Sequence, residues 1–389
     1  MSKKKENSKK KKVKILIVLL VVLSLLTAVC YIVPSVINRQ RSNGLSSGDE
    51  RPMNVQSGET ENESENLLMQ VDSGEINNIF TLGRNAALVT SNSLISVKQS
   101  GKISDITKVG YANPVVKTAG DKYMVFERST GKFAIMNKRG ILYQSQLDER
   151  IINCDIASNG NYAIISEKTL SVSLVTLYSN KNRVLFQWEC SDEYLTDIAL
   201  SSNGKSLALA GLFVKNSESG SKVMYFKSNS TGVEKTFEFD ESVIYKVKFL
   251  RGNNIGLVTD KEYVTVNIDK DEIKTASFDY DTVDGYQFNE NMNTAILKTQ
   301  FGSLNEHSVV VFDRNCNQIF ETGVEGEVID FKLDKNQLYV LTSGGVMIYQ
   351  LSSGDLIKTV ETPAGIKKIS VFSKCIICAD EKSVYKFEK

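Results

Sequence analysis

Short apolar segments that recur about every 41 residues are the feature of this sequence that most restricts its fold. The clearest copies are CDIASNGNYAIIS, which begins at Cys154, and DIALSSNGKSLALAG, which begins at Asp197. Each copy reads as an alternating strand, a tight polar turn and a more continuously apolar strand. A recurrence of this length is typical of the four-stranded blades of a propeller. We therefore expect an all-β protein.

Weaker copies of the same phrase extend the repeat along the chain. The second residue of the turn falls near Asn85, Asp121, Gly160, Gly204, Asn253, Met292, Lys335 and Lys374. The Asn-Gly pairs at 159–160 and 203–204 predict two-residue hairpin turns, because both positions tolerate a positive φ. Eight turns predict a β-propeller of about eight four-stranded blades. Seven blades are the alternative, since several copies are weak.

The final repeat is incomplete. Its segment IKKISVFSKCIICADEKSVYKFEK supplies three strands before the chain ends. A ring of sheets removes its free edges only when it is closed. The apolar stretch at 67–71, which precedes the first repeat, is predicted to supply the missing strand, so that residues 67–389 form the propeller.

An uncharged segment of nineteen residues, Ile15 to Val33, follows a Lys-rich start. A helix of that length spans roughly 28 Å, close to the hydrocarbon thickness of a bilayer. The Lys cluster in 1–14 predicts a cytoplasmic tail and a translocated remainder. The segment is longer than the apolar core of a cleaved signal peptide. We therefore predict one transmembrane helix that contacts membrane lipid and places the C-terminal domain outside the cytoplasm.

Residues 34–66 differ from both neighbours in composition. They are rich in Ser, Asn, Gly and Glu and poor in large apolar side chains, which predicts a flexible linker. The chain as a whole has 47 Lys and Arg against 46 Asp and Glu. Because residues 1–33 hold a Lys cluster, the rest is mildly acidic and shows no basic stripe. We expect no nucleic-acid partner.

This layout resembles known propeller proteins. On the two phrases above and their period, residues 67–389 resemble β-propeller repeat proteins of the WD40-like and quinoprotein-like kind. A Lys-rich tail, one anchor and a divergent propeller together also resemble an uncharacterised clostridial-type family of single-pass, membrane-anchored propeller proteins. The resemblance implies the fold and no known activity.

Side chains that commonly catalyse reactions or bind metals are few. His307 is the single histidine of the chain, and its neighbours predict an exposed loop between strands. Cys375 and Cys378 form a Cys-x-x-Cys pair, but residues three apart on a strand point to opposite faces. We predict that both cysteines belong to the core, and we assign no metal site and no cofactor.

Acidic residues are the other candidates for chemistry. Asp279, Asp281 and Asp284 lie in the segment SFDYDTVDGY. Paired carboxylates across a channel would suit glycoside hydrolysis. Asp281 and Asp284 would also offer oxygen ligands to calcium, although without the spacing of an EF-hand loop. One sequence does not show which acids converge, so no catalytic residue is assigned.

The predicted layout favours a membrane-anchored, extracytoplasmic scaffold that binds an envelope protein or polymer. A propeller presents broad faces of loops, and the linker gives those faces reach. The alternative function is that of an extracytoplasmic hydrolase or lyase that uses acidic residues in the channel.

Overall fold

The computed structural model describes residues 66–389 except 72–74, 83–84, 92, 129, 170–171, 216–217, 279–280, 290, 301 and 303–305. The predicted tail, the predicted anchor at 15–33 and the predicted linker up to residue 65 lie outside the described residues. In the part of the chain that is described, no helix is long and apolar enough to cross a membrane. The described residues all belong to one compact unit, which begins at Asn54.

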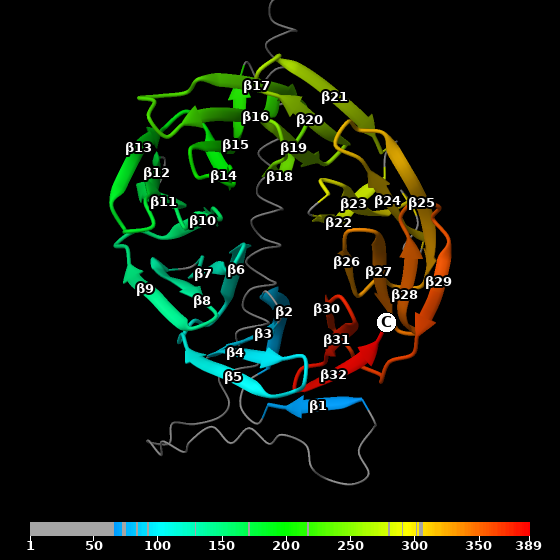
Figure 1. Ribbon diagram of the computed structural model, residues 1–389. Helices are drawn as coiled ribbons and strands as arrows, with labels where there is room; N and C mark the ends of the chain where they lie inside the picture. The colour runs from blue at the N-terminus through cyan, green and yellow to red at the C-terminus, as the bar shows by residue number, and fades with distance from the viewer. Residues whose placement is uncertain are drawn as a thin grey trace, which may run out of the picture. The chain divides into compact units, whose positions relative to one another are not determined.

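The described elements are β-strands, which form eight four-stranded antiparallel sheets. Figure 1 shows these sheets arranged as blades in a ring around a central axis. The predicted eight-bladed propeller is therefore confirmed, and the seven-bladed alternative is wrong.

Seven blades use four consecutive strands, numbered from the innermost strand outwards. Blade 1 comprises β2 (Ile76–Leu82), β3 (Asn85–Thr90), β4 (Ser93–Lys98) and β5 (Ile103–Lys108), and blade 2 comprises β6 (Pro114–Ala119), β7 (Lys122–Glu127), β8 (Lys132–Asn137) and β9 (Gly140–Gln146). Blade 3 comprises β10 (Ile151–Ile156), β11 (Tyr162–Thr169), β12 (Val172–Tyr178) and β13 (Val184–Cys190), and blade 4 comprises β14 (Tyr194–Leu200), β15 (Ser206–Lys215), β16 (Glu218–Lys227) and β17 (Lys235–Asp240). Blade 5 comprises β18 (Ile244–Phe249), β19 (Asn254–Thr259), β20 (Glu262–Asn267) and β21 (Glu272–Ser277), and blade 6 comprises β22 (Thr282–Phe288), β23 (Thr294–Thr299), β24 (Glu306–Phe312) and β25 (Gln318–Glu325). Blade 7 comprises β26 (Asp330–Leu333), β27 (Gln337–Thr342), β28 (Gly345–Gln350) and β29 (Leu356–Val360).

Blade 8 joins the two ends of the propeller. It contains β30 (Lys368–Val371), β31 (Cys375–Ala379), β32 (Ser383–Glu388) and, as its outermost strand, β1 (Leu67–Gln70). β1 pairs antiparallel with β32 from Leu67 opposite Tyr385 to Gln70 opposite Ser383. The predicted composite blade is confirmed. Its closure links the first described strand to the last, so the ring cannot open without breaking this sheet.

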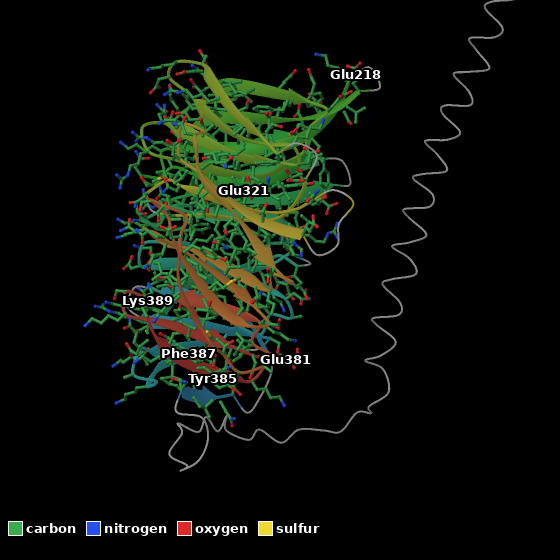
Figure 2. The ribbon with its side chains drawn as sticks, turned by 90° about the vertical axis from the view of Figure 1, so that its right-hand side faces the viewer. Glu218, Glu321, Glu381, Tyr385, Phe387 and Lys389 are labelled. Carbon is green, nitrogen blue, oxygen red and sulfur yellow. The ribbon has the colours of Figure 1, made fainter. Side chains whose placement is uncertain are left out.

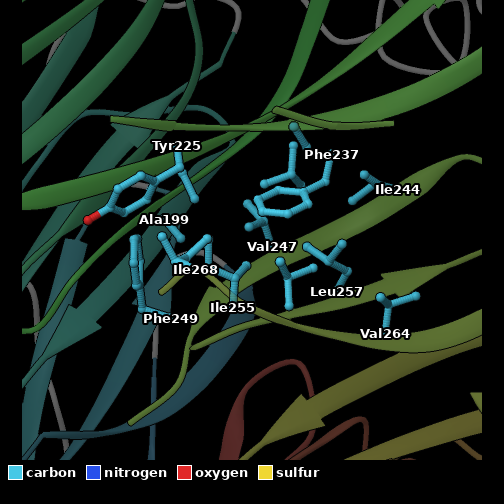
Figure 3. Close-up of a cluster of buried hydrophobic side chains, with 14 of the residues drawn as sticks. Ala199, Tyr225, Phe237, Ile244, Val247, Phe249, Ile255, Leu257, Val264 and Ile268 are labelled. Carbon is cyan, nitrogen blue, oxygen red and sulfur yellow. The ribbon is translucent and has the colours of Figure 1, made fainter. Parts of the chain in front are cut away.

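Eight hydrophobic clusters lie between the blades, one at each pair of neighbours. Figure 3 shows the cluster between blades 4 and 5, where Ala199 and Tyr225 of one blade face Ile255 and Leu257 of the next. A middle strand is covered on both sides, which explains the near-continuous apolar runs in β3 and its counterparts. The outermost strands alternate or are largely exposed, as in β21.

The Asn-Gly turns differ from their prediction. Gly160 and Gly204 have positive φ values of 88° and 63°, but Asn159 and Asn203 do not share that conformation. In the first turn, the Gly160 N–H donates to the Ala157 carbonyl at 2.8 Å. The loop is therefore a longer type I turn that ends in a left-handed glycine, rather than a two-residue turn with two positive φ values.

Turns gather at two ends of the propeller. Because strands alternate in direction within a blade, the turns from first to second and from third to fourth strand lie at one end. Neighbouring turns touch there, since Asn159 Nδ2 donates to the Asn203 carbonyl at 2.6 Å. The chain enters β1 at that end, where the Asn66 carbonyl accepts from the Lys386 N–H at 2.9 Å. We call this end the entry face.

The turns from second to third strand and the connections between blades lie at the other end, which we call the opposite face. Figure 2 views the propeller from its side, with Lys389 on the entry face and Glu218 and Glu381 on the opposite face. The two faces are therefore built from different, alternating segments of the chain.

Charge divides between the two faces. Among the described residues outside strands, the entry face has twelve Lys and Arg and seven Asp and Glu: Lys102, Lys138, Arg139, Lys181, Arg183, Lys205, Arg251, Lys270, Arg314, Lys335, Lys374 and Lys389, against Asp121, Glu234, Asp269, Asp271, Asp313, Asp334 and Asp355. Counted in the same way, the opposite face has five Lys and Arg and twelve Asp and Glu: Arg128, Arg150, Lys261, Lys367 and Lys382, against Glu75, Asp148, Glu149, Asp192, Glu193, Glu241, Asp260, Asp281, Glu327, Glu361, Asp380 and Glu381.

We predict that ring closure depends on Met69, which is 1% exposed in the cluster between blades 8 and 1. Met69→Ala should lower the free energy of unfolding of the fragment 54–389 by about 2–5 kcal/mol, because it leaves a cavity in that cluster. Urea denaturation measures the change. Gln70→Ala is the control, since Gln70 on the same strand is exposed. Equal stability of the two variants would contradict the role of β1.

Candidate functional site

A cavity of about 570 Å³ occupies the channel at the opposite face. It is lined by residues on the innermost strands β6, β10, β14, β18 and β22 and by Arg128 in the turn after β7. We call it the channel mouth; its principal polar side chains are those of Lys117, Arg128, Asn153, Asp197, Lys246 and Tyr286. It gathers residues from five blades that are far apart in the chain.

A β-bulge near the start of the innermost strand positions three of these side chains. The pairing register shifts between Ile151 and Asn153, between Leu195 and Asp197, and between Ile244 and Lys246. A bulge re-aims the residue that follows it and strengthens the local twist. The residue after each bulge, namely Asn153, Asp197 or Lys246, lines the channel mouth.

Asp197 is the centre of a fixed polar network. Its side chain is 5% exposed and forms an ion pair with Lys246, with Nζ to Oδ2 at 2.8 Å. It also accepts hydrogen bonds from the Val247 N–H at 2.8 Å and from Asn153 Nδ2 at 2.8 Å. The carboxylate therefore joins the innermost strands of three successive blades. Hydrogen bonds satisfy most of its lone pairs, as a buried charge requires.

Two lysines in the channel mouth are shifted in opposite directions. Burial lowers the pKa of Lys246, but the charges of Asp197 and Asp155 outweigh it, and the net pKa is raised. Burial and repulsion by Lys246 lower the pKa of Lys117. Lys117 has no hydrogen-bond or ion-pair partner within the described part of the chain, so its ammonium group is available to an anionic group in the cavity.

A second cavity, of about 820 Å³, lies on the flank of blades 5 and 6. In it, Lys298 Nζ lies 2.9 Å from Asp281 Oδ2 and 3.0 Å from Glu321 Oε1. Ser308 Oγ also donates to Glu321 Oε1 at 2.9 Å. One ammonium group therefore bridges Asp281 and Glu321 and offsets part of their negative charge.

The predicted exposed loop position of His307 is wrong. His307 lies on β24, and its side chain is 15% exposed. Its Nδ1 is 2.8 Å from Thr299 Oγ1, and Thr299 donates in turn to Asp284. The polar residues around His307 predict a loop because they interrupt the alternation, whereas cross-strand pairing with Thr299 places the ring against β23.

The predicted acidic candidates do not form one site. Asp279 lies outside the described residues. Asp281 pairs with Lys298, while Asp284 contacts Thr299 and lies 3.9 Å from His307 Nδ1. Among the residues that the structure describes, no group of three or more His, Cys, Asp or Glu side chains is placed to hold a metal ion.

The interpretation of Cys375 and Cys378 is confirmed. Both are buried on β31, Cys375 in the cluster between blades 8 and 1 and Cys378 in the cluster between blades 7 and 8. Their sulfurs lie on opposite sides of the sheet. Burial raises the pKa of both thiols, to about 12 for Cys378, which suits inert core residues.

Asp284, one of the predicted candidate acids, also lines the channel mouth, but the sequence analysis missed the other residues of this cavity. A signal was nevertheless present, because in several repeats a polar residue stands immediately before a buried apolar residue of the innermost strand. Examples are Asn153 before Cys154, Asp197 before Ile198, and Asp330 before Phe331. Asp330 repeats the linking role of Asp197, since its Oδ2 accepts from the Ile369 N–H of the next blade at 2.9 Å.

Comparison with known proteins supports the fold and names a family. The family described as "Family of unknown function (DUF5711)" matches residues 57–385. The sequence matches no curated protein.

Solved structures similar to this chain are propellers of low sequence identity. BamB from Moraxella catarrhalis has 11% identity and a TM-score of 0.51 and covers 82% of this chain and 99% of its own. Sqt1 from Saccharomyces cerevisiae has 12% identity and a TM-score of 0.57, with coverage of 84% and 100%. Hsv2 from Kluyveromyces lactis has 9% identity and a TM-score of 0.51, with coverage of 75% and 100%. At such identities the likeness is one of fold.

We predict that Asp197→Ala strongly destabilises the fragment 54–389, because it leaves Lys246 buried without its counter-charge. The expected loss is about 3–5 kcal/mol in the free energy of unfolding. Glu381→Ala, which breaks the exposed pair with Lys367, is the control and should cost less than about 1 kcal/mol. Equal losses in urea denaturation would show that the buried pair carries no special weight.

The lowered pKa of Lys117 predicts a pH-dependent effect. At a pH below the pKa of Lys117 in the folded protein, the full free-energy cost of burying its charge lowers the stability of the fold. This cost diminishes as pH rises towards the ordinary lysine pKa of 10.5, because the folded protein then holds the neutral amine. Lys117→Met should therefore stabilise the fragment most at neutral pH, with a gain that shrinks as pH rises. Thermal unfolding across this range measures the gain, with the exposed Lys138→Met as control. A stability gain that grows with pH would contradict a lowered pKa of Lys117.

Proposed function

The chain belongs to the DUF5711 family, a family of unknown function, and we propose from its own geometry that it is a membrane-anchored, extracytoplasmic binding scaffold. Its partner is an envelope protein that docks on the opposite face. The observation that carries the proposal is a group of exposed apolar side chains on blades 4 and 5, beside the channel mouth.

A projecting hairpin supports this docking face. β15 and β16 are ten-residue strands, but β14 pairs with β15 only as far as Leu212, and β17 pairs with β16 only as far as Gly220. Beyond these points the two strand ends pair with each other, and one further hydrogen bond joins the Glu241 N–H to the Ser219 carbonyl at 2.9 Å. Figure 2 shows Glu218 of this hairpin at the rim of the opposite face. A strand pair that extends past both neighbouring strands offers a partner a raised contact surface.

Exposed apolar residues lie on the hairpin and on the neighbouring segments of blades 4 and 5. Tyr194 is 66% exposed, Val214 78%, Val243 38% and Tyr245 44%. Tyr245 also lines the channel mouth. Exposed aromatic and aliphatic side chains that gather beside a cavity are typical of protein docking surfaces, where large residues enter pockets of the partner.

The sequence supports membrane attachment. The uncharged segment 15–33 is long enough to cross a bilayer, and the Lys cluster before it would keep the N-terminus in the cytoplasm. The polar residues 34–66 would then tether the propeller outside the membrane. An extracytoplasmic propeller on a tether can meet partners that are themselves fixed in the envelope.

The arrangement of acids favours a scaffold over the hydrolase or lyase alternative. Asp197 is held by Lys246, and Asp281 and Glu321 share Lys298. General acid catalysis needs a carboxyl group with a raised pKa beside a second free carboxylate. Carboxylates bridged by ammonium groups are poor candidates for that role.

Cross-linking on intact cells tests the proposal. Cells that carry the full chain would be treated with a membrane-impermeant cross-linker, and the cross-linked partner identified by mass spectrometry. We expect one recurrent envelope partner. The double variant Val214→Asp, Tyr245→Asp should lose it, because two charges would be buried in the interface.

The matched control is Leu356→Asp, Ile357→Asp, which alters equally exposed residues of blade 7, at 50% and 49% exposure. This variant should keep the partner. Absence of any recurrent partner would count against a scaffold. A partner retained by the first variant and lost by the second would place docking elsewhere on the propeller.

A further inference from the structure

Four basic side chains of the entry face, on blades 2 and 3, form no ion pair within the described residues, and several acids of this face are engaged. Asp121 pairs with Lys122, and Asp334 pairs with Lys389. Asp313 accepts hydrogen bonds from the backbone and side chain of Asn317. These three acids are therefore held by close neighbours, although the Asp334 pair also occupies Lys389 of the same face.

The cations of blades 2 and 3 are the clearest free group. Lys138 and Arg139 lie in the turn before β9, and Lys181 and Arg183 in the turn before β13. All four are exposed and have no ion pair within the described part of the chain. They belong to third-to-fourth-strand turns of adjacent blades, so they face solvent on the same side of the propeller. An extended anionic surface could engage all of them together.

The point where the chain enters the propeller lies on the same face. Asn66 precedes β1 at the end of β32 that leads to Lys389. The residues before it, 34–65, are the predicted linker, and a flexible chain of that length spans roughly 30 Å. A face tethered so closely to a surface meets it at an effective concentration in the millimolar range, so weak contacts are enough.

We propose that the entry face is a docking surface for anionic phospholipid headgroups and that it lies against the membrane in which the chain is anchored. Each Lys or Arg near an anionic bilayer adds attraction that falls off within a Debye length. The opposite face, with its projecting hairpin and channel mouth, then points away from the membrane. This inference takes the membrane tether from the proposed function. Lipid binding by the entry face is nevertheless measured on a fragment that lacks the predicted anchor.

The arrangement favours a membrane over other anionic partners. The cations are spread across a whole face, which suits a broad, uniformly charged surface rather than a single bound strand. The attachment point on that face brings a membrane surface, rather than a distant polymer, within reach of the turns. The excess of acid on the opposite face would repel the same surface and so set one orientation.

Vesicle co-sedimentation tests the proposal. The probe is the fragment 54–389, which contains every described strand and interblade cluster and so has the complete closed ring. We expect it to bind vesicles of phosphatidylcholine mixed with phosphatidylglycerol, to ignore vesicles of phosphatidylcholine alone, and to release as salt increases.

Two charge-matched variants locate the interaction. The entry-face variant combines Lys138→Glu, Arg139→Glu, Lys181→Glu and Arg183→Glu. The opposite-face control combines Arg150→Glu, Lys261→Glu, Lys367→Glu and Lys382→Glu, with the same change in net charge. We expect the first to weaken vesicle binding by more than about a hundredfold and the second to stay within a few-fold of the parent. Circular dichroism would check that both remain folded.

Three outcomes would overturn the proposal. The first is failure of the parent fragment to bind anionic vesicles. The second is an equal loss of binding in both variants, which would show that net charge, rather than the position of the charges on the entry face, determines binding. The third is binding to soluble polyphosphate without binding to vesicles, which would assign the face to an anionic polymer. None of these outcomes bears on partner cross-linking at Val214 and Tyr245, so the two proposals fail independently.

Discussion

The pairing of β1 with β32 is the contact on which the rest of this structure depends. Each blade covers one side of its neighbour, so a cluster between two blades is complete only when both are in place. Closure by β1 completes the last of these clusters and leaves no blade with a bare side. It also determines that the chain enters on the face that carries the turns from first to second strand. This places the entry of the chain on the same face as the proposed lipid-docking surface.

The fold was largely readable from the sequence because its physical causes are local and periodic. Middle strands are covered on both sides, so they are apolar throughout, and turns recur wherever the chain reverses. The three-stranded last repeat left one strand missing, and the stretch at 67–71 was the apolar segment available to fill it. Closure was therefore predictable as a requirement for covering an edge.

The channel mouth was not predicted, because its residues meet only through the ring. Asn153, Asp197 and Lys246 come from three successive blades and interact only when bulges turn them towards the channel. The same holds for His307, whose burial depends on pairing with Thr299 rather than on its sequence neighbours. The charge difference between the faces is a further case. Basic and acidic turns alternate along the chain, so the linear sequence shows no stripe, and antiparallel pairing sorts them to opposite ends.

Hydrogen exchange is the most direct test of the central claim, that β1 closes an eight-bladed ring. In the fragment 54–389, the amides of β1 and β32 that pair with each other should exchange as slowly as those of edge strands paired within other blades, such as β5 and β9. They should also open together with the rest of blade 8, because they belong to the same sheet. Rapid exchange of β1 with slow exchange of β30 to β32 would contradict closure and would leave the propeller an open chain of blades.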